Sequence, residues 1–216
     1  MMLKHCYKHI ISYHDQQHHG VIGFPKLLQV SSNVGMVKTM QSLDPSKYWD
    51  WLQKLGLDEK PDTDLPGSVG GQMKKKELFV KQPIHQAVAS YGQGFSITPL
   101  KLAQLHALIA NGGKLVSPHI TKGFNNKHSL NQNTNKQLLD PQVSDTVLEW
   151  MESVVDNYGE GSVKTENYRI GGKTGTADQT KDGINYNFKI CSFVAILPIE
   201  SPRFVVLVVI DNPRKT

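Results

Sequence analysis

Two short groups of polar residues have the types and spacing of catalytic machinery. Ser31 and Asn33 lie on either side of Ser32 at a break between two apolar segments, and Lys173-Thr174-Gly175-Thr176 opens a strand-like segment. A serine with an asparagine two positions later and a lysine-threonine-glycine run occur together in sites that transfer an acyl group through a reactive serine. Either string alone is common by chance, so the surrounding elements must decide its meaning.

The first group lies in a helical region. Apolar residues recur at three- and four-residue steps from Phe24 to Leu43, and the polar run 31–35 interrupts them. The pattern predicts two short helices with a junction at the interruption. Asp44-Pro45 then predicts a capped helix that ends near Leu55, before Gly56.

The middle of the chain predicts further helices joined by loops. Residues 57–83 contain several Pro and Gly residues and are expected to form a loop, and helical character returns over 84–90. Thr98-Pro99 predicts a helix to about residue 110 that is apolar on most sides and therefore buried. Residues 121–139 are expected to form a polar surface insertion, and Asp140-Pro141 caps a helix to about Asn157.

The C-terminal part changes to β-type patterning. Segments 168–177, 188–197 and 203–211 are rich in strand-forming residues, and 198–202 has the length of a hairpin connection. The second polar group therefore lies on the first of three predicted strands. The layout is a helical block followed by a three-stranded antiparallel block.

The composition fits a globular protein. Of 216 residues, 38% are hydrophobic and 20% are charged, and 24 basic against 19 acidic residues give a net charge of +5. The densest basic run, Lys74-Lys75-Lys76, is too short for a nucleic-acid patch, so no nucleic-acid partner is expected. Two cysteines make no disulfide framework.

No membrane segment, targeting signal or cofactor site is predicted. Residues 1–12 lack the apolar core of a signal peptide, and the longest apolar run, 204–210, is far shorter than the roughly 20 residues that span a bilayer. His14, His18 and His19 have only Asp15 as a nearby carboxylate, which favours a solvated cluster over a metal site. We expect no metal and no organic cofactor.

Longer strings carry a specific resemblance. Gln29 to Gly35, Tyr91 to Ala103, Tyr168 to Ala177 and Phe204 to Pro213 resemble the S-x-N segment, the G-Q-G-x-x-x-T-P helix, the K-T-G-T strand and the last strand of class B penicillin-binding proteins of the septal type. The resemblance implies an α+β fold of the penicillin-binding and β-lactamase-like type, in which a helical lobe packs on an antiparallel sheet and the cleft lies between the two motifs. We divide the chain into an irregular stretch, 1–20, and a partial transpeptidase domain, 21–213.

The resemblance also implies roles for the polar residues. The family acylates a serine with a D-alanyl-D-alanine stem peptide or a β-lactam. Ser31 would help to move the nucleophile's proton, Asn33 would hold the peptide amide, and Lys173 would supply positive charge. Thr174 and Thr176 would bind the substrate carboxylate, Gly175 would leave room for the substrate, and the Thr176 N–H would form half of an oxyanion hole. Peptidoglycan stem peptides, β-lactams and division proteins are the implied partners.

One motif of the set is missing from these residues. No lysine has a serine three positions before it, so the nucleophilic serine of S-x-x-K is absent. We therefore interpret the sequence as a domain truncated at both ends and expect it to be inactive alone. The family is anchored in the inner membrane with a periplasmic catalytic domain, whereas this chain, expressed alone without signal or anchor, is expected in the cytoplasm.

Three alternatives compete with a transpeptidase. A non-catalytic remnant or a module that binds stem peptides or a division partner ranks above an active enzyme for the isolated chain. A class A β-lactamase is disfavoured because its E-x-x-x-N string does not occur. A phosphate-binding loop at Gly172-Lys173-Thr174 would need a glycine at position 167, where Asn stands, and a following helix.

Overall fold

The computed structural model describes residues 4–6, 9–11, 19–121, 136–158, 163, 165–181 and 184–214. The chain divides into two compact units. Unit 1 comprises 1–58 and 71–96, and unit 2 comprises 59–70 and 97–216. Most of the predicted insertion 121–139, together with His14 and His18, lies outside the described residues. The predicted division of the chain after residue 20 remains a prediction.

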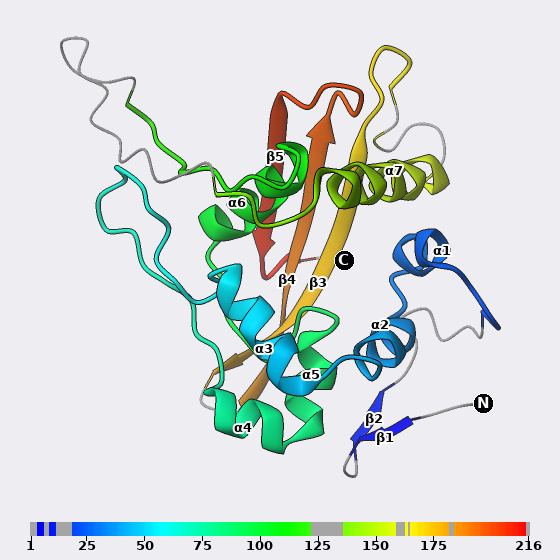
Figure 1. The fold of residues 1–216 in the computed structure, drawn as a ribbon, viewed down its shortest axis with the longest axis vertical. Helices are drawn as coiled ribbons and strands as arrows, with labels where there is room; N and C mark the ends of the chain where they lie inside the picture. Colours follow the sequence, from blue (N-terminus) through cyan, green and yellow to red (C-terminus); the bar gives the residue numbers. More distant parts are fainter. Residues whose placement is uncertain are drawn as a thin grey trace. The chain divides into compact units, whose positions relative to one another are not determined.

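Unit 1 is a group of helices with one short hairpin (Figure 1). Its elements are β1 (Lys4–Cys6), β2 (His9–Ile11), α1 (Phe24–Gln29), α2 (Asn33–Met40), α3 (Pro45–Lys54), α4 (Lys76–Lys81) and α5 (Pro83–Ala89). The two strands pair antiparallel within the stretch for which the sequence predicts irregular structure. The core is formed by Val34, Val37, Met40 and Ala87, with Tyr48, Ile84 and Tyr91 packed against them.

Helix α4 corrects the prediction of a continuous loop over 57–83. Phe79 is buried in this helix and meets Tyr48 edge to face, with ring centroids 5.6 Å apart. The Gln86 side chain of α5 donates to the carbonyl oxygens of Phe79 and Val80 at 2.9 and 3.0 Å. These contacts are tertiary, and so a local pattern dominated by lysines and flanking glycines did not predict them.

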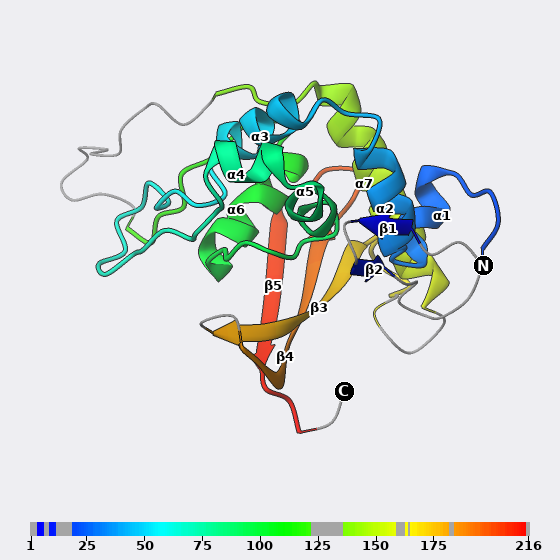
Figure 2. The ribbon, with the colours of Figure 1, turned by 90° about the horizontal axis from the view of Figure 1, so that it is seen from below.

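The described residues of unit 2 form two helices and a three-stranded sheet (Figures 1 and 2). The helices are α6 (Pro99–Ala110) and α7 (Pro141–Asn157), and the strands are β3 (Gly171–Lys181), β4 (Ile184–Leu197) and β5 (Phe204–Asp211). The sheet is antiparallel in the order β3-β4-β5. The predicted helical block followed by an antiparallel block is confirmed.

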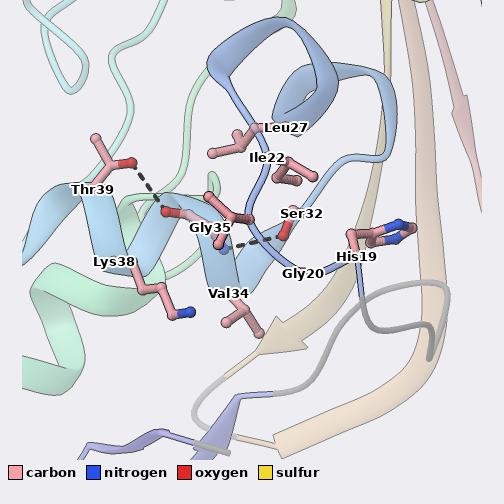
Figure 3. Close-up of a pocket in the computed structure, with 10 residues that line it drawn as sticks. His19, Gly20, Ile22, Leu27, Ser32, Val34, Gly35, Lys38 and Thr39 are labelled. Atoms are coloured by element: carbon pink, nitrogen blue, oxygen red, sulfur yellow. Dashed lines mark hydrogen bonds between the residues drawn. The ribbon is translucent and has the colours of Figure 1, made fainter. Parts of the chain in front are cut away.

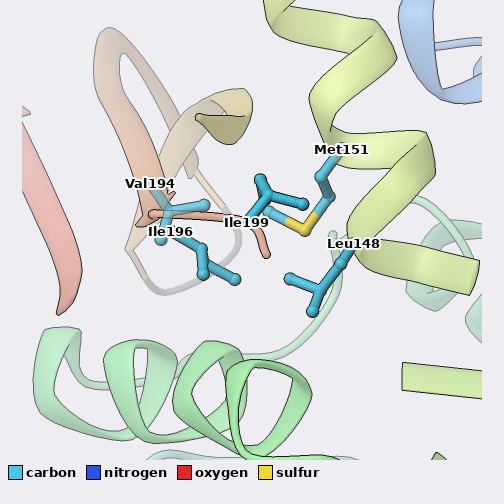
Figure 4. Packing of buried hydrophobic residues seen from close by; sticks show 5 residues of the cluster. All are labelled: Leu148, Met151, Val194, Ile196 and Ile199. Carbon is cyan, nitrogen blue, oxygen red and sulfur yellow. The ribbon is translucent and has the colours of Figure 1, made fainter. Parts of the chain in front are cut away.

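Both helices pack on one face of this sheet. Leu148 and Met151 of α7 meet Val194, Ile196 and Ile199 in the buried cluster of Figure 4. Ile109 and Ala110 of α6 and Val205 and Leu207 of β5 pack against the same cluster. The most buried side chains of α6 also include two polar ones, Lys101 and Gln104, so this helix is less uniformly apolar in its contacts than its sequence predicts. Among the described residues, no helix is long and apolar enough to cross a bilayer.

Candidate functional site

The S-x-N segment begins with a residue in an uncommon backbone conformation. Ser31 has φ of 47°. Its amide donates to Leu28 O at 3.2 Å, and the amide of Ser32 donates to Leu27 O at 3.1 Å. These two bonds form a Schellman motif at the end of α1, in which the left-handed position is usually glycine. A serine there costs on the order of 1 kcal/mol, so the structure keeps this side chain against a local preference.

The next residue, Ser32, connects the two helices. Its side chain is 2% exposed, and its hydroxyl accepts from the Gly35 amide at 3.1 Å, which caps the N-terminus of α2. Asn33 is the first residue of α2. The side chain that caps α2 is therefore that of Ser32, whereas Ser31 and Asn33 keep partly exposed side chains on either side of it.

A cavity of about 230 Å³ lies next to this junction within unit 1. Its lining includes Ser32, Val34 and Lys38, together with His19 and Leu27 (Figure 3). A Cβ atom on Gly35 would lie 2.7 Å from Leu27 Cδ1, so glycine is needed for α1 to approach α2 here. The close approach of the two helices holds the junction in place.

The K-T-G-T group lies in β3, as the sequence predicts, although β3 begins at Gly171 rather than near Tyr168. Lys173 and Gly175 pair with Val194 and Ser192 of β4, while Thr174 and Thr176 pair with Phe193 and Cys191. Since alternate residues of one strand share a face, Thr174 and Thr176 lie on one face of β3 and alternate with Lys173. Both threonines are exposed. Within the described residues, β3 pairs with β4 alone, so its other edge is open.

Lys173 is half-buried. Its Nζ donates to the Thr174 carbonyl oxygen at 3.1 Å and lies 3.4 Å from Thr174 Oγ1. Burial lowers the pKa of Lys173, because the ammonium loses hydration. The Lys173 ammonium therefore loses its proton more readily than an exposed lysine does.

Three glycines allow close packing around the motif. A Cβ on Gly171 would lie 2.6 Å from Ile199 Cδ1, and one on Gly172 would lie 2.7 Å from Phe193 Cζ. Gly175 was expected to leave room for a substrate, and the structure gives it a further constraint: its Cβ would lie 2.7 Å from Ser192 Oγ. Close packing of Gly175 against Ser192 does not exclude that the same glycine leaves room for a substrate. The role toward the substrate stays a prediction.

Two polar contacts join the end of α7 to β3 and to the residues before it, and neither was predicted from the sequence. Arg169, two residues before β3, donates through Nε and Nη2 to the two carboxylate oxygens of Glu152 at 2.6 Å each, and this raises the pKa of Arg169. Tyr158, the C-cap of α7, has its hydroxyl 3.0 Å from Thr174 Oγ1. An Arg and a Glu 17 residues apart give no local signal, and neither does a Tyr 16 residues before a Thr.

The predicted site residues divide between the two units. Ser31 and Asn33 belong to unit 1, and the run Lys173 to Thr176 belongs to unit 2. Each group is held together within its own unit, and their meeting in one cleft remains a prediction. Among the residues that the structure describes, no group of three or more His, Cys, Asp and Glu side chains is placed to hold a metal ion.

Comparison with known proteins assigns the family. The sequence model of the family described as penicillin binding protein transpeptidase domain matches residues 4–216 of this chain. The chain belongs to this family. The transpeptidase sequence is 39% identical to the peptidoglycan D,D-transpeptidase FtsI homolog of Mesostigma viride, over 87% of this chain and 35% of that protein. It is of the class B type to which FtsI and penicillin-binding protein 3 belong.

Solved transpeptidase structures have the same fold. The transpeptidase domain of penicillin-binding protein 3 from Burkholderia pseudomallei matches with a TM-score of 0.78 and 30% identity, over 90% of this chain and 58% of that one. Penicillin-binding protein 3 of Mycobacterium tuberculosis in complex with ampicillin matches with a TM-score of 0.74 and 26% identity, over 91% of this chain and 47% of that one. The predicted α+β transpeptidase fold is confirmed. The chain spans 31–43% of the length of three curated relatives that it matches.

Proposed function

We propose that these residues supply the S-x-N and K-T-G-T parts of a septal-type D,D-transpeptidase site, which cross-links peptidoglycan stem peptides. The observation that carries the proposal is the conformation of the S-x-N junction. Ser31 occupies a left-handed position that glycine would fill at lower cost, while its neighbour Ser32 does the capping. Strain retained at a polar side chain is typical of functional positions.

The chemistry of the motifs supports the assignment of roles. In the proposal a serine hydroxyl attacks the carbonyl carbon of the penultimate D-alanine, and its proton passes through Ser31 to the leaving D-alanine amine. A stem-peptide amine then attacks the acyl-serine, so that the serine is regenerated. Asn33 holds the substrate amide in this scheme. Ser31 and Asn33 are both partly exposed, as residues that contact a substrate must be.

The β3 motif would bind the anionic end of the substrate. Thr174 and Thr176 lie exposed on the same face of the strand, beside an ammonium group. Hydroxyls next to a cation are suited to bind a carboxylate. Gly175 would let the substrate lie along the open strand edge, and the Thr176 N–H would stabilise the developing oxyanion, a contribution of about 3–4 kcal/mol to lowering the barrier.

Without a nucleophilic serine, these 216 residues are not expected to catalyse acyl transfer alone. They contain no S-x-x-K string, and we propose that without one they form no acyl-enzyme. The second candidate function is therefore binding without reaction, in which the K-T-G-T strand holds a stem peptide or the chain contacts a division partner. The membrane anchor, the extracytoplasmic site and the septal partners of the whole protein are part of the proposal.

Incubation with benzylpenicillin tests the account of the nucleophile. We expect the intact mass of the 216-residue chain to stay unchanged after incubation with excess benzylpenicillin. A mass increase by one penicillin, mapped to a serine by peptide digestion, would show that a nucleophile outside the S-x-x-K pattern is present. Such a result would contradict both the proposed inactivity and the candidate role of pure binding.

A further inference from the structure

A tyrosine outside every motif contacts the K-T-G-T strand. The Tyr158 hydroxyl lies 3.0 Å from Thr174 Oγ1, and either oxygen is able to donate. Tyr158 follows α7 as its C-cap and is 38% exposed, so the phenol ring lies at the surface beside the exposed Thr174. The contact places a second hydroxyl at the point where the motif presents its first threonine.

The packing of α7 on β3 explains why this tyrosine reaches the motif. A Cβ on Gly172 would lie 3.1 Å from Val155 Cγ2, so the absent side chain lets α7 come close to the strand at this point. Tyr158 follows Val155 by three residues, a rise of about 4.5 Å along a helix. Thr174 follows Gly172 by two residues, about 6.6 Å along a strand. The close approach of Val155 to Gly172 thus lies one helical turn from Tyr158 and two strand residues from Thr174.

Two polar groups therefore converge on Thr174, the Tyr158 hydroxyl and the Lys173 ammonium. Lys173 Nζ is 3.4 Å from Thr174 Oγ1 and donates to the Thr174 carbonyl oxygen at 3.1 Å. An ammonium group has only protons to give, so Thr174 Oγ1 accepts on the side of Lys173. When Tyr158 also donates, both lone pairs of Oγ1 are used, and the threonine O–H is left to donate toward an anion.

We propose that Tyr158 is a positioning residue that orients the Thr174 hydroxyl as a donor to the carboxylate of the stem peptide. The inference rests on the proposed function, because it deepens the role of Thr174 in carboxylate binding. Tyr158 itself need not touch the substrate. Its effect would be confined to ligands that carry a free carboxylate and would depend on the Thr174 hydroxyl.

The test compares two ligands on the 216-residue chain and its variants. N-acetyl-D-alanyl-D-alanine and its C-terminal amide are titrated separately, and dissociation constants are taken from the NMR shifts of the Thr174 and Thr176 amides. Tyr158→Phe keeps the ring and removes the hydroxyl. Tyr168→Phe is the matched control, because Tyr168 is also exposed near the start of β3. Thr174→Val provides the background for a double-mutant cycle.

We expect the wild-type chain to prefer the carboxylate ligand. Tyr158→Phe should weaken carboxylate binding about three- to tenfold, the usual range for one hydrogen bond, and leave binding of the amide unchanged. Tyr168→Phe should change neither, and Tyr158→Phe should have no further effect in the Thr174→Val background.

Three results would overturn the inference and leave the proposed function standing. Equal binding by the wild type and Tyr158→Phe would show that the phenol does not act. Equal weakening of both ligands would show that the variant only disturbs the fold. If Tyr158→Phe still weakens carboxylate binding in the Thr174→Val background, Tyr158 does not act through the Thr174 hydroxyl. A wild-type chain without preference for the carboxylate would contradict the proposed function as well, which distinguishes the two failures.

Discussion

The amide of Ser32 donates to the carbonyl oxygen of Leu27 at 3.1 Å, and this bond closes the turn that leaves Ser31 with φ of 47°. A glycine at position 31 would adopt the same φ without steric cost. Ser31→Gly should therefore stabilise unit 1 by about 0.5–1 kcal/mol while it removes the hydroxyl that the proposed reaction needs.

The neighbouring serine provides the matched comparison in denaturant unfolding. Ser32→Ala removes the cap of α2 and should destabilise unit 1 by about 1 kcal/mol. Opposite signs for the two variants are the expected result. A loss of stability in Ser31→Gly would show that the serine is retained for structural reasons and would contradict a functional origin of the strain.

The uncovered side of β5 predicts self-association. Phe204, Val206, Val208 and Ile210 alternate along the strand and are 48–60% exposed, whereas Val205 and Leu207 pack under the helices. Exposed apolar strands of this kind favour aggregation. We expect the double variant Val206→Lys/Val208→Lys to increase the monomer fraction in size-exclusion chromatography and to lower binding of a hydrophobic dye.

The buried side of the same strand serves as control. Leu207→Lys places a charge in the packed cluster and should lower the midpoint of thermal unfolding sharply. A soluble monomeric wild-type chain with a sharp two-state melt would contradict the expectation of self-association.

A carboxylate joins two loops of unit 2 and predicts an acid-sensitive step. Asp64 accepts from the amides of Ile120 and Thr121, each at 2.9 Å, and from the Thr121 hydroxyl. These bonds, with the Thr121 hydroxyl bond the largest cause, lower the pKa of Asp64 from 3.8 to about 2. Because the folded pKa lies below the unfolded one, this contribution to stability is present above about pH 4 and is lost as the pH falls toward 2.

Denaturant unfolding from pH 5 to pH 2 measures that contribution. Asp64→Asn should lower stability at pH 5 and show a shallower loss of stability below pH 4 than the wild type. Asp58→Asn makes the same chemical change at a carboxylate that accepts from Gln53 Nε2 and serves as the comparison. Parallel pH profiles for wild type and Asp64→Asn would contradict the prediction.

Two glycines of β3 should respond differently to a methyl group. A Cβ on Gly172 meets the Phe193 ring at 2.7 Å and the backbone oxygen of Val194 at 3.0 Å, and neither yields easily. Gly172→Ala should destabilise unit 2 by about 1–3 kcal/mol. A Cβ on Gly175 meets only Ser192 Oγ, which is able to rotate, so Gly175→Ala should cost much less. Thermal unfolding of both variants checks the order, and a reversed order would contradict the packing account.

Local signals predicted the long helices well. Asp44, Thr98 and Asp140 each precede a proline, and each is the observed N-cap with its side chain accepting from a backbone amide. A cap and a proline at the first helical position act within one turn, so the local sequence is sufficient to predict where each helix begins. The β hairpin from β4 to β5 was predicted for a similar reason, because its strands are long and apolar.

Tertiary effects explain what the sequence did not predict. Helix α4 depends on the burial of Phe79 and on the Gln86 side chain, which reaches back across seven residues. The left-handed conformation of residue 31 was not predicted because a serine, and not a glycine, occupies that position. The contact from Tyr158 to Thr174 depends on how α7 packs on β3. The helix junction and the strand that carry the polar motifs were predicted correctly, because these elements are locally encoded.

The most direct test of the account is acylation of a chimera that supplies the missing serine. Residues 19–214 would replace the matching segment of the Burkholderia pseudomallei transpeptidase domain, so that S-x-x-K comes from that domain and S-x-N and K-T-G-T come from this chain. We expect the folded chimera to gain the mass of one benzylpenicillin, and Lys173→Met to slow this acylation at least about a hundredfold. A chimera that melts cooperatively but is not acylated, or that reacts equally fast without Lys173, would contradict the proposed transpeptidase function.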